Sequence, residues 1–172
     1  MHFRKTFTAA MLAATLTVSG LGSAPAFAAT KSDADVLREA RDKDEIEHLA
    51  WRYARALDTF DPDGYVAVYT PDGSFGPTKG RDALHKMIAA LRRDAKPTDR
   101  IISPLLHMET NKWIEFKDKD HAVFHYYWIT IRKPEKQGDP TTVVAAGNGI
   151  DELVRLDGKW LFKSRSITAP ND

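Results

Sequence analysis

Three side chains of this sequence, Tyr53, Asp58 and His107, are of the types that carry out general acid-base chemistry. Histidine is the side chain best suited to proton transfer near neutral pH. A carboxylate bonded to one ring nitrogen would fix the tautomer and stabilise the imidazolium, which leaves the other nitrogen to act as a base. A tyrosine hydroxyl would donate a hydrogen bond to a developing oxyanion or a departing hydroxyl. Such a set could abstract a proton from carbon with no metal or organic cofactor.

Each of these residues also has an ordinary structural interpretation. Tyr53 lies on the apolar stripe of a predicted helix, where a core tyrosine would bond to backbone. Asp58 could cap the turn before Asp61, and His107 begins an apolar strand. A five-residue step turns about 140° around a helix, so Tyr53 and Asp58 can flank one pocket only at the helix's C-terminal end. Asn111, four residues after His107, is expected on the same face of the strand.

Helical periodicity dominates the first half of the chain. Apolar residues recur mostly three and four residues apart from Ser32 to the region of Asp58, which predicts a long helix. A short second helix is expected over 64–69, ended by 71–73, and a third over 80–94. The first of these helices must position Tyr53 and Asp58 at the pocket.

The second half of the chain has the composition of β-strands. Aromatic and β-branched residues dominate four segments, and Asp157-Gly158 between the last two is a strong hairpin signal. The predicted strands are 105–116, 122–132, 142–156 and 159–168. Helices followed by strands predict an α+β fold, in which three N-terminal helices pack on a curved antiparallel sheet and enclose a pocket.

The N-terminal residues predict a secretory signal peptide over 1–28. Arg4 and Lys5 precede an apolar run over 9–18, and small residues continue to Ala28. The apolar run is shorter than the ~20 residues that span a bilayer. We therefore expect cleavage near Ala28, a short N-terminal extension over 29–43, and a secreted or periplasmic protein without membrane contact; an uncleaved anchor is the alternative.

Charge and composition exclude several classes of function. The chain has 25 Lys and Arg against 24 Asp and Glu, and losing Arg4 and Lys5 with the signal leaves a charge of about −1. A neutral domain does not favour nucleic acid, whose binding needs clustered basic residues. No cysteine is present, which excludes thiol catalysis and cysteine-ligated metals. The histidines lack metal-ligand spacing and no Gly-rich loop follows a strand, so neither a metal nor another cofactor is expected.

From Asp44 to Thr168 the sequence resembles the SnoaL-like branch of the nuclear transport factor 2-like superfamily. Four segments carry this resemblance in the family's order: 46–58, 69–75, 106–111 and 149–162. The resemblance implies a cone-shaped α+β domain over 44–170.

Within that branch, the candidate site resembles a group of lyases that includes bile acid 7α-dehydratase, scytalone dehydratase and hexachlorocyclohexane dehydrochlorinase. These lyases place an aspartate at the end of the first helix and a histidine at the start of the strand after the third, matching Asp58 and His107. A tyrosine of the bile acid enzyme matches Tyr53. The dehydrochlorinase's asparagine, four residues after its histidine, matches Asn111.

The positions that would contact substrate do not reproduce those of any one of these lyases. A second histidine of scytalone dehydratase corresponds to about Tyr127, and its pocket asparagine falls beside Asn148. Phe75, Tyr127 and Trp128 are candidates for pocket walls, with ordinary core packing as the alternative. Asn111 completes the predicted substrate-binding set.

Residues and resemblance together predict a dehydratase-type lyase or an isomerase that acts on a small, largely apolar, cyclic or polyketide-like compound. Two other functions stay open: a non-catalytic exported protein that binds a small molecule in the same cavity, and an interaction domain that uses only its sheet. The predicted strands carry more apolar residues than one helical layer covers. We therefore expect a homodimer through the outer sheet face.

Overall fold

The computed structural model describes residues 31–94, 103–134 and 136–168. The predicted signal peptide and its cleavage site lie outside these residues. Ser32–Asp172 forms one compact unit. Within the described part of the chain, no helix combines the length and the apolar character needed to cross a membrane.

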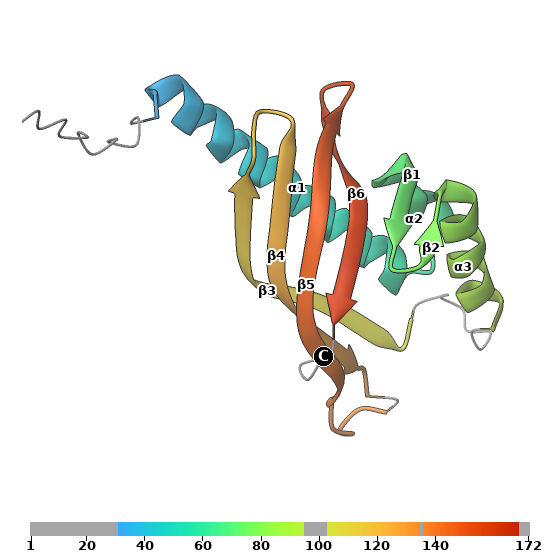
Figure 1. The fold of residues 1–172 in the computed structure, drawn as a ribbon. Coiled ribbons are helices and arrows are strands. Elements are labelled where there is room, and N and C mark those ends of the chain that lie inside the picture. Colours follow the sequence, from blue (N-terminus) through green and yellow to red (C-terminus); the bar gives the residue numbers. More distant parts are fainter. Residues whose placement is uncertain (1–30, 95–102, 135, 169–172) are drawn as a thin grey trace, which may run out of the picture. The chain divides into compact units, whose positions relative to one another are not determined.

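Three helices precede the long strands, as predicted (Figure 1). Helix α1 (Asp33–Asp58) begins after Ser32, whose side chain caps it by accepting a hydrogen bond from the Asp35 N–H. Helix α2 (Pro62–Ala67) starts two residues earlier than expected, and helix α3 spans Arg81–Asp94. Because α1 is continuous from Asp33, residues 33–43 are part of the first helix.

The segment after α2 is a strand, which the sequence analysis missed. β1 (Tyr69–Phe75) forms a hairpin with β2 (Thr78–Lys79) and pairs in parallel with the last strand, β6 (Lys159–Thr168). Proline and glycine at Pro71 and Gly73 are typical of a turn, but the β1–β6 pairing is irregular between Tyr69 and Ser74. A proline is tolerated where a strand's ladder is interrupted, because its missing N–H is not needed there.

The four long strands form where they were expected: β3 (Leu105–Phe116), β4 (His121–Arg132), β5 (Thr142–Leu156) and β6 (Lys159–Thr168). The strand order is β2-β1-β6-β5-β4-β3, and every neighbouring pair except β1–β6 is antiparallel. Figure 1 shows α1 crossing one face of the sheet and β3 bending along its length. This arrangement confirms the predicted α+β class.

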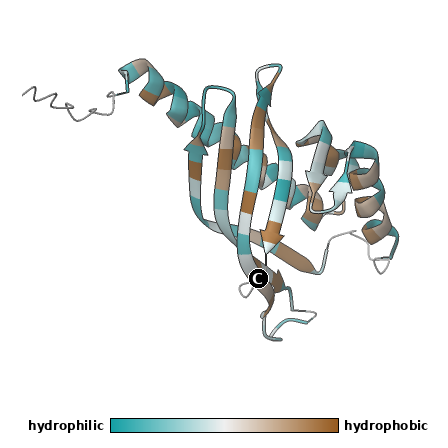
Figure 2. Cartoon of the chain, in the orientation of Figure 1, coloured by the Kyte–Doolittle hydropathy of each residue, from teal (hydrophilic) through white to brown (hydrophobic). Residues whose placement is uncertain are grey.

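The hydrophobic core lies between α1 and the inner face of the sheet. Ile46 and Leu49 of α1 pack with side chains that alternate along the strands, such as Phe124, Leu153 and Phe162, all of them fully buried. Figure 2 shows the corresponding alternation of hydrophobic and hydrophilic segments along the strands. The core therefore fixes which residues of each strand face α1, and with them the site described next.

Candidate active site

The predicted contact between Asp58 and His107 is present. Asp58 is the last residue of α1 and only 6% exposed, and His107 is the third residue of β3. The Oδ1 atom of Asp58 lies 2.7 Å from His107 Nδ1. The backbone N–H of His107 points at the same carboxylate, 3.3 Å from each oxygen. A further bond, from the Ser103 N–H to the Asp58 carbonyl at 2.9 Å, ties the start of β3 to the helix end.

These bonds determine the state of the imidazole. An ionised carboxylate only accepts hydrogen bonds, so Nδ1 carries a proton and its N–H donates a hydrogen bond to Asp58. In the neutral form of the ring, Nε2 is then the unprotonated nitrogen, with a lone pair available as a base. Because two groups of His107 bond to one carboxylate, the ring is held in a single orientation.

His107 lines a cavity of about 110 Å³ between α1 and the sheet. Its side chain keeps 27% exposure, so the ring is accessible to a small molecule. Of the predicted site residues, Tyr53, Phe75 and Trp128 line this cavity with His107. The remaining lining residues are Leu57, Met108, Glu109, Tyr126, Ile129, Thr130, Arg165 and Ile167.

Tyr53 is buried beside this cavity. Burial raises the pKa of the Tyr53 hydroxyl well above its ordinary value, which keeps it protonated and able to donate a hydrogen bond. Its ring lies under the guanidinium of Arg165, with the Arg165 Cζ 3.6 Å from the ring centroid. Tyr53 therefore also provides a cation–π support for a buried charge.

A buried polar network adjoins the cavity, and the sequence analysis did not find it. The Nε atom of Arg165 lies 2.9 Å from Asp151 Oδ2, and its Nη2 donates to Glu109 Oε1. The same Nη2 donates to the Tyr126 hydroxyl at 2.7 Å, and that hydroxyl donates to Asp151 Oδ1 at 3.2 Å. One signal was available, because Asp151 alternates with Gly149 and Leu153 at positions that face the core.

Burial sets the charges of this network. It raises the pKa of the Asp151 carboxyl to about 7. Burial alone would lower the pKa of Arg165, but Asp151 and Glu109 outweigh it and raise that pKa well above its ordinary value. Arg165 is therefore a permanent buried cation, and its Nη1 atom has no hydrogen-bond partner among the described residues.

Three predicted substrate-binding residues lie elsewhere. Asn111, Tyr127 and Asn148 are exposed and line a separate cavity that includes Trp113, not the cavity of His107. Tyr127 alternates with the buried Tyr126, so it faces the other side of the sheet. Asn111 fails to share the face of His107 because β3 has a bulge between Thr110 and Trp113, where Asn111 adopts a φ of 51°.

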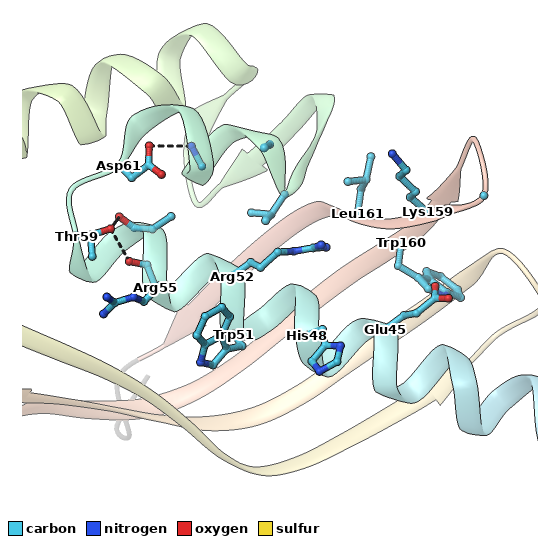
Figure 3. A pocket seen from close by; sticks show the side chains of 15 residues that line it. Glu45, His48, Trp51, Arg52, Arg55, Thr59, Asp61, Lys159, Trp160 and Leu161 are labelled. Carbon is cyan, nitrogen blue, oxygen red and sulfur yellow. Dashed lines mark hydrogen bonds between the residues drawn. The ribbon is translucent and has the colours of Figure 1, made fainter.

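A larger cleft, of about 600 Å³, is lined by residues of α1, α2 and the turn between β5 and β6. Figure 3 shows Arg52 of this cleft reaching toward Lys159, with Trp51 and Arg55 on the same helix. Its Asp61 caps α2 rather than facing a partner base. In the part of the chain that the structure describes, no group of three or more His, Cys, Asp or Glu side chains could hold a metal ion. Tyr53 and His107, with Asp58 behind the histidine, lie at the smaller cavity, where we place the candidate site.

Comparisons with known proteins agree with this fold. A protein of unknown function from Mycobacterium tuberculosis superposes with a TM-score of 0.65 at 22% identity, over 78% of this chain and 75% of that chain. A putative scytalone dehydratase from Novosphingobium aromaticivorans superposes with a TM-score of 0.62 at 23% identity, over 78% of this chain and 87% of that chain. A protein of unknown function with a cystatin-like fold from Nostoc punctiforme superposes with a TM-score of 0.62 at 24% identity, over 76% of this chain and 92% of that chain. No curated protein matches significantly.

A match of the sequence to a protein-family model is stronger evidence of relationship than these structural similarities. Residues 38–166 match the model of the SnoaL-like domain, which covers three quarters of the sequence and includes Tyr53, Asp58 and His107. A structural neighbour from Novosphingobium aromaticivorans that is described as NTF2-like shares the arrangement of helices and sheet. The family model matches three quarters of the sequence, and the chain therefore belongs to the SnoaL-like domain family.

Proposed function

We propose that this domain is a dehydratase-type lyase or an isomerase that removes a proton from carbon in a small, largely apolar, cyclic or polyketide-like compound. The observation that carries the proposal is the 2.7 Å contact between Asp58 Oδ1 and His107 Nδ1 beside a cavity. A protein that only bound its ligand would not need a base oriented in this way. Family membership supports the proposal, because this sequence resembles lyases of that family at Asp58 and His107.

The proposed reaction begins with the substrate's acidic carbon next to His107 Nε2. That nitrogen takes the proton, and the carboxylate of Asp58 stabilises the imidazolium that forms. The Tyr53 hydroxyl donates a hydrogen bond to the oxygen on which negative charge develops. His107 then returns the proton to the departing hydroxyl, which leaves as water, or to another carbon, which gives an isomer. Each positioned group contributes a factor of roughly 10²–10⁴ to the rate.

Proton abstraction can be measured without knowing the natural substrate. Exchange of the α-protons of cyclohexanone in D₂O, followed by ¹H NMR, reports the first step, and the dehydration of 3-hydroxycyclohexanone to an absorbing enone reports elimination. We expect the wild type to accelerate exchange and His107→Ala to lose at least about 100-fold of that acceleration. His48→Ala is the matched control, because His48 lies exposed on α1.

Two results would contradict the proposal. One is a wild type that exchanges no faster than buffer, and the other is a His107→Ala variant as active as the wild type. Tyr53→Phe tests the hydroxyl separately, because it keeps the ring under Arg165. A ligand that binds with no proton exchange would favour the non-catalytic binding protein instead.

The proposal also includes export and self-association. The predicted signal over 1–28 supports release as a secreted or periplasmic protein, and mass spectrometry of protein exported by the native host would detect an N-terminus at or near Ala29. Exposed aromatic and aliphatic side chains on the outer sheet face, among them Trp113 and Tyr127, support a homodimer. A small apolar molecule is the expected ligand in either case.

A further inference from the structure

The cavity of His107 contains a second charged group that the proposed proton transfer does not use. Glu109 is two residues after His107 on the same face of β3, and both side chains line the cavity. Two steps along a strand separate their Cα atoms by about 6–7 Å, roughly the width of one small ring. A molecule that contacts His107 therefore reaches Glu109 with its other end.

Glu109 is held in place by a buried cation. Its Oε1 accepts a hydrogen bond from Arg165 Nη2, and Arg165 is only 2% exposed. Arg165 is itself fixed by Asp151, by the Tyr126 hydroxyl and by the ring of Tyr53. Because the guanidinium has no room to rearrange, the orientation of the Glu109 carboxylate is fixed as well.

One hydrogen-bonding atom of this pair is open to a ligand. No described residue donates to the Oε2 atom of Glu109, and this atom is not among those sealed from solvent. The Glu109 side chain keeps 11% exposure. The Nη1 atom of Arg165 also has no partner among the described residues, but it is sealed from solvent and therefore closed to a ligand. The free acceptor of Glu109 thus lies in a largely apolar wall.

Only some ligand groups suit this acceptor. A neutral hydroxyl group donates a hydrogen bond to a carboxylate. A ketone accepts only and leaves Glu109 unpaired. A carboxylate is repelled by Glu109, and an ammonium group is repelled by Arg165. Leaving a desolvated carboxylate oxygen unpaired is costly, which disfavours the other groups.

We propose that the Glu109–Arg165 pair is the substrate's hydroxyl-binding site, and that the substrate is a hydroxylated compound whose enclosed part is a single small ring. Glu109 accepts the hydrogen bond from the hydroxyl, and Arg165 positions Glu109. The cavity of about 110 Å³ is smaller than an engineered cavity of about 150 Å³ that holds one benzene, so it encloses no more than one small ring. This inference rests on the proposed function, since it names the substrate class for the same cavity.

Phenol and fluorobenzene are suitable probes, because they have similar size but only phenol donates a hydrogen bond. Their dissociation constants are measured by ligand-detected NMR titration on the wild type. An apolar cavity without a polar site favours the more hydrophobic fluorobenzene. We expect the wild type to bind phenol at least about tenfold more tightly than fluorobenzene, because charge-assisted hydrogen bonds are the strong ones.

Variants then locate this preference. Glu109→Gln removes the charge, and we expect it to reduce the preference at least several-fold. The matched control is Glu115→Gln, because Glu115 is on the same strand, pairs with Lys117 and does not line the cavity. Thermal unfolding checks that Glu109→Gln is folded. If that variant does not fold, the ratio of the wild type's dissociation constants for fluorobenzene and phenol still tests the proposal. A wild type with no preference for phenol overturns it.

A last variant separates this inference from the proposed function. His107→Ala should lose proton exchange yet keep the preference for phenol. An equal affinity of the wild type for both probes, with proton exchange intact, overturns the hydroxyl site alone. A preference for phenol that Glu109→Gln leaves unchanged overturns it as well.

Discussion

At the scale of single residues, Asp58 occupies a position that does not favour the stability of its helix. It is the last residue of α1, where the negative end of the helix dipole opposes a carboxylate. It is also buried, which penalises its charge. The three hydrogen-bond contacts from His107 offset these costs. A charge held at such a position is typical of a functional site, where stability is exchanged for activity.

The first prediction follows from this conflict. Asp58→Asn keeps the shape of the side chain but removes the charge that orients and stabilises the protonated His107. We expect proton exchange on cyclohexanone to fall by roughly 10²–10⁴-fold. The midpoint of thermal unfolding should stay equal or rise, because the unfavourable charge is gone. A variant that keeps full activity would show that Asp58 has no role in proton transfer. A variant that unfolds at a much lower temperature would show that Asp58 stabilises the fold.

The second prediction concerns Asp151, whose pKa of about 7 exceeds the ordinary value of 3.8 because of burial. Between these two values the folded protein holds a proton that the unfolded chain has released. This group therefore makes the free energy of unfolding fall as pH rises from about 4 to 7, by at most about 1.4 kcal/mol per pH unit. Above pH 7 it adds no further change.

Asp151→Asn removes this titration, while Glu109, Arg165 and Tyr126 still face the site. Urea unfolding of both proteins at several pH values between 4 and 8 gives the comparison. We expect the free energy of unfolding of the wild type, relative to Asp151→Asn, to decrease toward pH 7 and then to level off. A difference that does not change with pH would mean that Asp151 is ionised throughout.

At the scale of elements, the bulge in β3 decides which cavity each side chain enters. Before the bulge, His107 and Glu109 face the inner cavity, opposite Thr130 and Trp128. After it, Trp113 pairs with His125 on the outer face, and their rings stack at 4.7 Å. One strand therefore contributes to the candidate active site and to the exposed face of the sheet. If β3 kept a regular alternation past Glu109, Trp113 would point into the core.

The third prediction tests what the bulge requires of its residues. Asn111 has a φ of 51°, a left-handed conformation that asparagine tolerates and that β-branched residues resist. Asn111→Val should lower the free energy of unfolding by about 1–2 kcal/mol, whereas Asn111→Gly should cost little. Urea unfolding measures both variants. Equal stability of the two variants would show that the bulge places no steric demand on this position.

At the scale of the whole molecule, the outer face of the sheet has no covering layer among the described residues. Trp113 is 58% exposed and Tyr127 54% exposed, and Ile150 lies with them around the same cavity. Aromatic side chains at this exposure on one face are typical of an interface. Such a patch supports the proposal of a twofold dimer, in which each copy would cover the same face of the other.

The fourth prediction is that the purified mature protein sediments as a dimer at micromolar concentration. Trp113→Glu should shift it toward the monomer, because a charge would be buried in the interface. Trp51→Glu is the control, since Trp51 is similarly exposed but lies on α1. Analytical ultracentrifugation distinguishes the two states. A monomeric wild type would contradict the prediction, as would a Trp113→Glu variant that remains a dimer.

The sequence alone indicated the local structure and the pairing of Asp58 with His107. Periodicity is a local property, so the helices α1 and α3 and the four long strands could be predicted close to their observed bounds. β1 could not, because Pro71 and Gly73 have the local character of a turn, and only the pairing with β6 makes the segment a strand. The pairing of Asp58 with His107 was predicted from the resemblance to a group of lyases that have an aspartate and a histidine at these positions.

Only the tertiary structure decided what surrounds that pair. The Asp157-Gly158 hairpin alone would place Asp151 opposite Ser164, but an irregularity between Glu152 and Leu153 moves it opposite Arg165. A bulge likewise removed Asn111 from the face of His107. A one-residue shift of register sends a side chain to the other face of a sheet. The buried charges of the site, Glu109, Asp151 and Arg165, therefore meet through long-range pairing and packing that no local pattern records.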